Sequence, residues 1–219
     1  MKYWYIGLII MGLLLSIPSF FFPNKYKNQH FIIFLILLLS VCLETYGTYT
    51  LLRKINNTIA YNLFFIYLET ILILLFFKSF LKTKIIKNSI NMAMIAFLLW
   101  GVGYSLYLGQ LDTFQTLSFT FGSLLIIICC IYFFVSIFLK DWFLDEKLIL
   151  NPLFWISTFI FLFYTSTFLY FSSVIFLTDL DKNLILILST SKRIMAVIMY
   201  LGMGLAFYLP YFNRSEKKN

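Results

Sequence analysis

Apolar runs of about 20 residues recur along the whole length of this chain, and each can cross the ~30 Å hydrocarbon core of a bilayer as an α-helix. Strands of a membrane barrel would alternate polar and apolar residues, which these runs do not do. We therefore predict an all-α polytopic membrane protein, a single bundle of about seven transmembrane helices. The spans fall roughly at 3–22, 31–52, 59–77, 89–109, 114–139, 150–177 and 184–212.

The composition leaves no room for a separate soluble domain. The 219 residues are 62% hydrophobic and 12% charged, whereas about 25% of a soluble domain is charged. We predict one transmembrane bundle over 1–212 and a short basic cytoplasmic tail over 213–219. Asn151 and Pro152 are typical of a helix start, and the segment 140–147 is typical of an amphipathic stretch at the membrane surface.

The distribution of lysine and arginine predicts the orientation. Short cytoplasmic loops of membrane proteins carry the excess of these residues. With the N-terminus outside and the C-terminus in the cytoplasm of the cell (inner or plasma) membrane, the outer side receives only Lys2, Arg53, Lys54 and Lys182. The cytoplasmic side receives Lys25, Lys27, Lys78, Lys82, Lys84, Lys87, Lys140, Lys147, Arg214, Lys217 and Lys218.

Polar side chains gather in the outer half of the predicted bundle. They recur at helical spacing on six spans, while stretches such as 31–39, 71–77 and 124–131 in the inner half are almost purely apolar. Helix–helix contacts through small residues give no reason for such asymmetry. We predict a polar cavity open to the outside and closed below by apolar residues; hydrogen bonds between helices and interfacial Tyr residues are the alternative explanation.

Four charged residues lie within the spans at similar depth: Glu44, Glu69, Lys192 and Arg193. Charges in a span normally pair or line water, because each costs at least ~2.5–3.5 kcal/mol near the bilayer centre. We expect one of the glutamates to pair with Arg193 or Lys192. Since neighbours on a helix point about 100° apart, we expect Arg193 to face the interior and Lys192 to extend toward the surface.

The sequence lacks the residues that most known membrane-embedded active sites require. His30 is the only histidine in the sequence, and the three cysteines (Cys42, Cys129 and Cys130) do not suggest a disulfide framework. We therefore predict neither a metal site nor a cofactor. The surroundings of Lys192 do not match a retinal site, and we see no membrane-embedded Ser–His pair of the rhomboid kind. Two hypotheses stay open beside ligand binding: a lipid-acting enzyme that uses Glu44 and Glu69, and a transporter of small solutes.

Two stretches carry a resemblance to known proteins: Tyr61 to Glu69 (YNLFFIYLE) and Asn151 to Ser157 (NPLFWIS). They resemble segments of short bacterial seven-helix membrane proteins and of the seven-helix input regions of sensor histidine kinases. The resemblance implies an input or accessory module whose output lies in a partner protein. The Lys192–Arg193 pair is not part of this resemblance.

Our hypothesis is a membrane sensor or accessory protein that binds a small or lipid ligand in the outer half of the bundle. The candidate ligand-binding residues are Glu44, Glu69, Arg193, Lys192, Asn62, Trp100, Tyr104, Thr120 and Tyr170. The candidate docking surface for a cytoplasmic or membrane partner is Lys78, Lys82, Lys84 and Lys87, which also suit anionic lipid. A second copy of the chain is a further candidate partner, and we predict no direct binding to nucleic acid.

Overall fold

The protein folds into one bundle of helices. The computed structural model describes residues 3–21, 25–107, 112–139, 148–176 and 182–210, and no strand occurs among them. Seven helical spans within these residues are long and apolar enough to cross a membrane, as predicted. Within each span the backbone groups bond to one another, which satisfies them where no water is present.

The spans begin and end close to the predicted positions. In chain order the elements are α1 (Tyr3–Ser16), η1 (Pro18–Phe21), α2 (Lys27–Leu52), α3 (Thr58–Ala60), η2 (Tyr61–Leu68), α4 (Glu69–Phe80), α5 (Lys84–Tyr107), α6 (Thr116–Leu139), η3 (Leu148–Leu150), α7 (Pro152–Phe176), α8 (Lys182–Leu205) and η4 (Ala206–Tyr208). The elements α3, η2 and α4 together make the third span. α2 and α5 start a few residues earlier than predicted, because their first turns are polar and extend beyond the apolar run.

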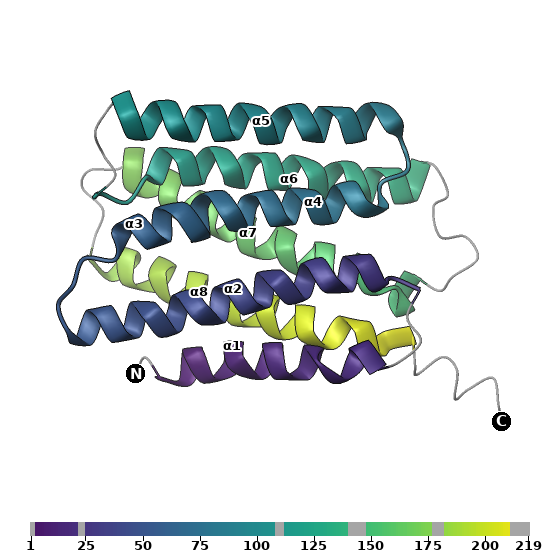
Figure 1. Ribbon diagram of the computed structural model, residues 1–219, viewed down its shortest axis with the longest axis horizontal. Helices are drawn as coiled ribbons and strands as arrows, with labels where there is room; N and C mark the ends of the chain where they lie inside the picture. Colours follow the sequence, from purple (N-terminus) through teal and green to yellow (C-terminus); the bar gives the residue numbers. More distant parts are fainter. Residues whose placement is uncertain (1–2, 22–24, 108–111, 140–147, 177–181, 211–219) are drawn as a thin grey trace.

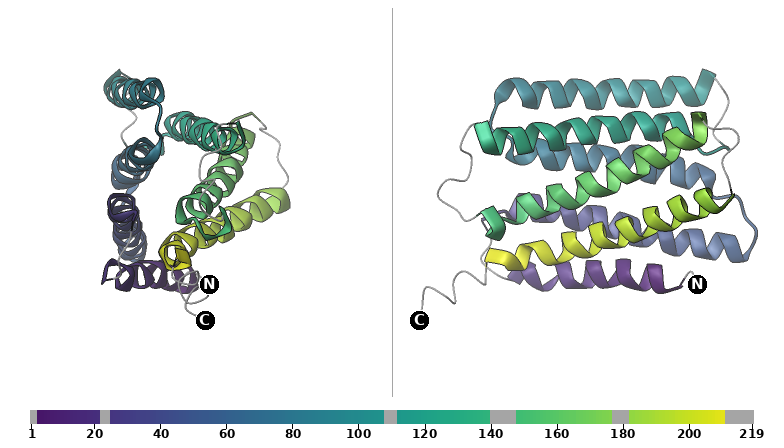
Figure 2. Two further views of the ribbon diagram at one scale, coloured as in Figure 1. Left: turned by 90° about the vertical axis from the view of Figure 1, so that its right-hand side faces the viewer. Right: turned by 180° about the vertical axis from the view of Figure 1, so that it is seen from behind.

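The helices run up and down and form two rows. Seen from the end, α5, α4, α2 and α1 make one row and α6, α7 and α8 make the other (Figure 2). Close contacts between α1 and α8 join the rows at one edge, and contacts of α6 with α4 and α5 join them at the other. α1 begins at the end of the bundle where α8 also begins, whereas α8 finishes at the opposite end (Figure 1).

Two glycines bring α1 and α8 unusually close together. A Cβ atom on Gly12 would lie 2.7 Å from the backbone oxygen of Tyr200, and a Cβ on Gly204 would collide with the carbonyl of Gly12. Such contacts through small residues are a common source of packing energy between helices in membranes, where the hydrophobic effect between helices is weak. This contact fixes the position of α1, whose first turns reach the site described below.

Aromatic side chains fill the end of the bundle opposite to the start of α1. Phe76, Phe77 and Phe133 are fully buried, and the ring of Phe80 lies 5.0 Å from that of Phe76 and 5.1 Å from that of Phe133. Ring pairs at such distances add to the packing energy of the interior. This end is therefore a dense apolar core.

The predicted start of α7 is confirmed. The Oδ1 atom of Asn151 accepts a hydrogen bond of 2.9 Å from the backbone N–H of Leu153, and α7 begins at Pro152. The Nδ2 atom of Asn151 also donates to the hydroxyl of Tyr26, 3.3 Å away, which ties this cap to the region before α2. The predicted surface segment 140–147 and the tail 213–219 lie outside the described residues.

The glycine contact leads to a testable prediction. We expect Gly12→Ala to destabilise the protein by about 1–3 kcal/mol, because its methyl group must push α8 away from α1. Gly7→Ala on the same helix is the control, since a Cβ there meets nothing within 4 Å. It should be neutral or stabilising by up to about 1 kcal/mol, because alanine favours a helix more than glycine does. Thermal unfolding in detergent measures both, and equal effects would contradict the proposed packing.

Candidate functional site

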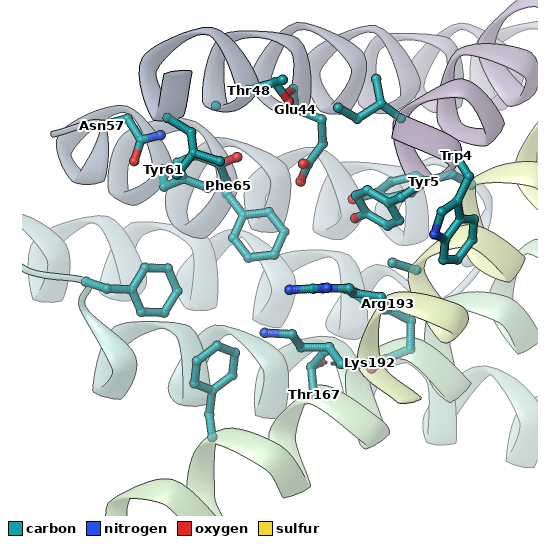
Figure 3. A pocket seen from close by; sticks show the side chains of 18 residues that line it. Trp4, Tyr5, Glu44, Thr48, Asn57, Tyr61, Phe65, Thr167, Lys192 and Arg193 are labelled. Carbon is teal, nitrogen blue, oxygen red and sulfur yellow. Dashed lines mark hydrogen bonds between the residues drawn. The ribbon is translucent and has the colours of Figure 1, made fainter. Parts of the chain in front are cut away.

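A cavity of about 500 Å³ lies between the helices at the end of the bundle where α1 begins. Its walls come from α1, α2, the π-helical segment η2, α7, α8 and the residues just before α6 (Figure 3). The lining residues are Trp4, Tyr5, Ile6, Glu44, Gly47, Thr48, Leu51, Asn57, Tyr61, Phe65, Phe114, Phe163, Thr167, Phe171, Lys192, Arg193, Ala196 and Tyr200. This volume falls in the range that binds small molecules.

Three charged side chains meet in this cavity. Glu44 reaches in from α2, and Lys192 and Arg193 reach in from α8 on the opposite side (Figure 3). All three belong to helices that are long and apolar enough to span a membrane. Because charges at such depth are costly, they are normally found where they pair or line a polar space. The structure thus brings three of the nine candidate ligand-binding residues to one place.

The expectation that Arg193 faces the interior while Lys192 extends to the surface is wrong, since both line the cavity and Lys192 is the less exposed of the two. The Lys192 ammonium lies 4.5 Å from the ring centre of Tyr170 and 4.8 Å from that of Phe171. Attraction to these ring faces draws the long lysine side chain across the helix surface toward the cavity. The Cβ atoms of the two neighbouring residues point in different directions on the helix. The long, flexible side chain of Lys192 bends back so that its ammonium still reaches the cavity.

Of the two glutamates predicted to pair with Arg193 or Lys192, Glu69 pairs with neither. Glu69 is fully buried, and its Oε1 atom accepts hydrogen bonds from the Tyr200 hydroxyl at 3.0 Å and the Tyr164 hydroxyl at 3.4 Å. Its Oε2 atom has no hydrogen-bond partner among the described residues. Because Tyr200 lines the cavity and Glu69 does not, the phenol of Tyr200 stands between the cavity and this carboxyl group.

The third span changes its helical form beside the cavity. Tyr61 to Leu68 form a π-helix, whose i→i+5 hydrogen bonds are rare and often mark functional positions. Tyr61 and Phe65 of this segment line the cavity, while Asn62 and Ile66 are buried on the side toward the other helices. The ring of Phe65 stacks on that of Phe119 at 5.3 Å. The π-helix therefore shapes one wall of the site.

A separate hydrogen-bond network accounts for several other predicted site residues. Asn62 donates to the Thr113 carbonyl at 2.8 Å and accepts from the Gln115 backbone N–H at 3.1 Å. The Tyr67 hydroxyl donates its proton to the Gln115 side chain, and its oxygen lies 3.1 Å from the Ser118 hydroxyl. Trp100 also donates to the Ser118 hydroxyl, at 3.2 Å. These groups satisfy one another and link η2, α5 and α6, so they stabilise the bundle and do not line the cavity.

The remaining candidates also lie outside the cavity lining. Tyr104 packs against Trp100, with ring centres 5.8 Å apart. Thr120 donates to the backbone carbonyl of Thr116 at 2.9 Å, a bond within its own helix. Tyr170 is next to the cavity and contacts two of its lining residues, Lys192 and Phe171. None of the three aromatic candidates, Trp100, Tyr104 and Tyr170, is in the lining.

The lining contains residues that the sequence analysis missed. Trp4, Tyr5, Asn57 and Tyr61 all line the cavity. Trp and Tyr near the ends of spans are commonly interfacial anchors, so their positions alone gave no reason to place them in a site. The register of the π-helix, which turns Tyr61 toward the cavity, leaves no signal in the residue pattern.

A buried Ser–His contact, which the sequence did not predict, lies at the end of the bundle opposite the cavity. His30 Nε2 lies 2.8 Å from the Ser19 hydroxyl and 3.1 Å from the Ser16 carbonyl oxygen. Ser19 in turn donates to that carbonyl at 2.8 Å, so its proton is engaged with the backbone. A nucleophilic serine must give this proton to the histidine. With its ring between Phe20 and Phe207, His30 instead holds η1 and η4 against α2.

The basic residues predicted as a docking surface lie at the end opposite the cavity, where α4 finishes and α5 begins (Figure 1). Lys82 and Lys84 are exposed, and Lys78 and Lys87 are half-buried. They are separated from the cavity by the length of the third span.

Comparisons with protein families, curated proteins and solved structures find no match to this chain.

The contacts of Glu69 lead to a second prediction. We expect Tyr200→Phe to destabilise the protein by about 1–3 kcal/mol, because it leaves a buried carboxyl group with only the longer bond from Tyr164. Tyr170→Phe is the matched control, since the Tyr170 hydroxyl makes no hydrogen bond to any described residue. Thermal unfolding compares the two variants. A loss of the same size in both would show that the bond to Glu69 contributes nothing.

Proposed function

We propose that this chain is a membrane sensor or accessory protein that binds a small or lipid ligand in the cavity and acts through a partner protein. The observation that carries the proposal is the meeting of Glu44, Lys192 and Arg193 in one cavity within the spans. Charges within membrane-spanning segments are costly and normally pair with one another or line a polar space. A cavity that receives a ligand or water provides such a space.

The proposed orientation opens the cavity to the outside of the cell. The N-terminus, the start of α8 and the cavity share one end of the bundle, and the lysine-rich connection between α4 and α5 is at the other. The excess of basic residues in the connections at that other end supports a cytoplasmic location for it. The cell membrane is the membrane we propose.

The third span offers a path from the cavity to a cytoplasmic partner. Its π-helical part supplies Tyr61 and Phe65 to the cavity wall, and Glu69 begins α4 directly after it. α4 ends at Phe80, close to Lys82 and Lys84. We propose that a ligand changes the balance between the π-helical and a regular α-helical register, which would shift α4 and the basic surface at its end.

The enzyme hypothesis loses support from the same geometry. It requires two carboxyl groups acting together on a substrate. Glu44 lines the cavity, but Glu69 is fully buried behind Tyr200 and bonded to two phenols. The two glutamates therefore do not face a common space, and ligand binding is the function that the site supports best.

Filling the cavity tests the proposal without changing its charge. Thr48 lines the cavity, and we expect Thr48→Trp to abolish the rise in unfolding temperature that a bound ligand produces. The assay is thermal unfolding in lipid nanodiscs across a library of metabolites and lipids. A ligand present at 100 times its dissociation constant stabilises the folded state by about 2.7 kcal/mol, which such an assay detects.

Thr45→Trp provides the matched control. Thr45 lies on the same helix, is exposed and makes the same kind of bond to the carbonyl four residues earlier as Thr48 does. This variant should keep the full response to ligand. If every stabilising compound acts equally on both variants, the cavity is not the binding site.

A further inference from the structure

We infer that the ligand of this cavity carries an anionic head group, a carboxylate or a phosphate, on an apolar body. The inference rests on the proposed function, because it names the class of ligand for the same site. Its starting point is Arg193, whose guanidinium points into the cavity (Figure 3). Arg193 is exposed at this cavity, and its guanidinium makes no hydrogen bond or ion pair with any residue that the structure describes.

A guanidinium that lines a cavity and has no acceptor from the described protein can bind an anion there. Its guanidinium offers five N–H donors in a planar fork, and the fork matches the two oxygens of a carboxylate or phosphate. Paired bonds of this kind are shorter and stronger than bonds between neutral groups. Since Arg193 has no such acceptor within the described protein, a bound anion would supply it.

The neighbouring cation strengthens this argument. Lys192 is held beside Arg193 by the rings of Tyr170 and Phe171, so its ammonium stays near the cavity instead of extending to the surface. Two cationic side chains and one carboxyl group, that of Glu44, therefore line the site. The sum of these charges is positive, which favours an anionic ligand over a cationic or neutral one.

The other walls select an apolar body. Phe65, Phe114, Phe163 and Phe171 contribute their rings to the lining, and Phe114 and Phe171 stack with their centres 5.4 Å apart. Trp4 and Ile6 add further apolar surface from α1. Binding of an alkyl chain or ring against such walls is favourable by about 25 cal/mol for each Å² of apolar surface removed from water. A small inorganic anion would leave these walls unused.

Such a ligand has two sources, and one experiment separates them. The protein is placed in nanodiscs of phosphatidylcholine and titrated by calorimetry with octanoate, octyl phosphate, octyltrimethylammonium and octyl glucoside, which share an alkyl chain and differ in charge. A parallel sample contains phosphatidylglycerol in the nanodisc, and native mass spectrometry records the lipid that stays bound. We expect the two anionic probes, or phosphatidylglycerol, to bind at least about tenfold more tightly than the neutral and cationic probes.

Arg193→Gln should remove most of this preference, with a loss of about tenfold or more in affinity for the anion. Arg53→Gln is the matched control: Arg53 is exposed like Arg193 and lies at the same end of the bundle, but outside the cavity lining. It makes the same change in charge and should leave binding unaltered. Binding of the soluble anions identifies a soluble ligand, and selective retention of phosphatidylglycerol identifies a membrane lipid; either supports the inference.

Two results would overturn it. Neutral or cationic probes that bind as tightly as the anions, or equal losses in Arg193→Gln and Arg53→Gln, would show that the cavity does not select an anion. If such binding is still abolished by Thr48→Trp, the proposed function stands and only the ligand class is wrong. If Thr48→Trp leaves the binding of every probe unchanged, the proposed function fails as well.

Discussion

The high cost of an unpaired polar group in the bilayer organises this molecule. Most polar side chains in the described spans find a partner in the protein or face a polar space; Glu69 Oε2 and the hydroxyls of Ser157 and Thr165 are buried without a hydrogen-bond partner. In the half of the bundle where α1 begins, both arrangements occur: some polar side chains bond to one another, and others line the cavity. Asn62, Tyr67 and Gln115 join a hydrogen-bond network, whereas Lys192 and Arg193 line a cavity. The network holds η2, α5 and α6 together, and the cavity opens where α1, α2, α7 and α8 meet η2.

The connection between the two regions is the third span. Its π-helical segment supplies Asn62 and Tyr67 to the network and Tyr61 and Phe65 to the cavity wall. A π-helix has weaker packing of its backbone than an α-helix, so it persists only where surrounding contacts hold it. Contacts with both regions meet that requirement. In the proposed function, the same segment is the element that responds to a ligand.

Much of the fold follows from residue patterns alone. The length and apolarity of each run predict the seven spans, and Asn151 followed by Pro152 predicts the start of α7. The gathering of polar residues toward one end also follows from counting along each span, because depth depends only on the rise per residue. These properties are local to one helix, which is why one sequence is enough to predict them.

The membership of the site depends on how the helices are rotated against one another, and this is not local. A polar stripe on α5 or α6 has the same sequence pattern whether it faces a cavity or another stripe. Trp100 and Asn62 therefore were indistinguishable from Glu44 until the packing was known. The close contact at Gly12, the change to a π-helix at Tyr61 and the attraction of Lys192 to two rings set the actual arrangement. None of them has a signature in the spacing of residues.

The division of the polar half into a cavity and a closed network can be measured by labelling single cysteines with a membrane-impermeant maleimide on intact cells. Cys42, Cys129 and Cys130 are first replaced by alanine, and a cysteine is introduced at Thr48 in the cavity or at Ser118 in the network. We predict labelling of Thr48→Cys from outside and none of Ser118→Cys. Similar labelling at both positions would contradict the division, and labelling of Thr48→Cys only after the cells are opened would contradict the orientation.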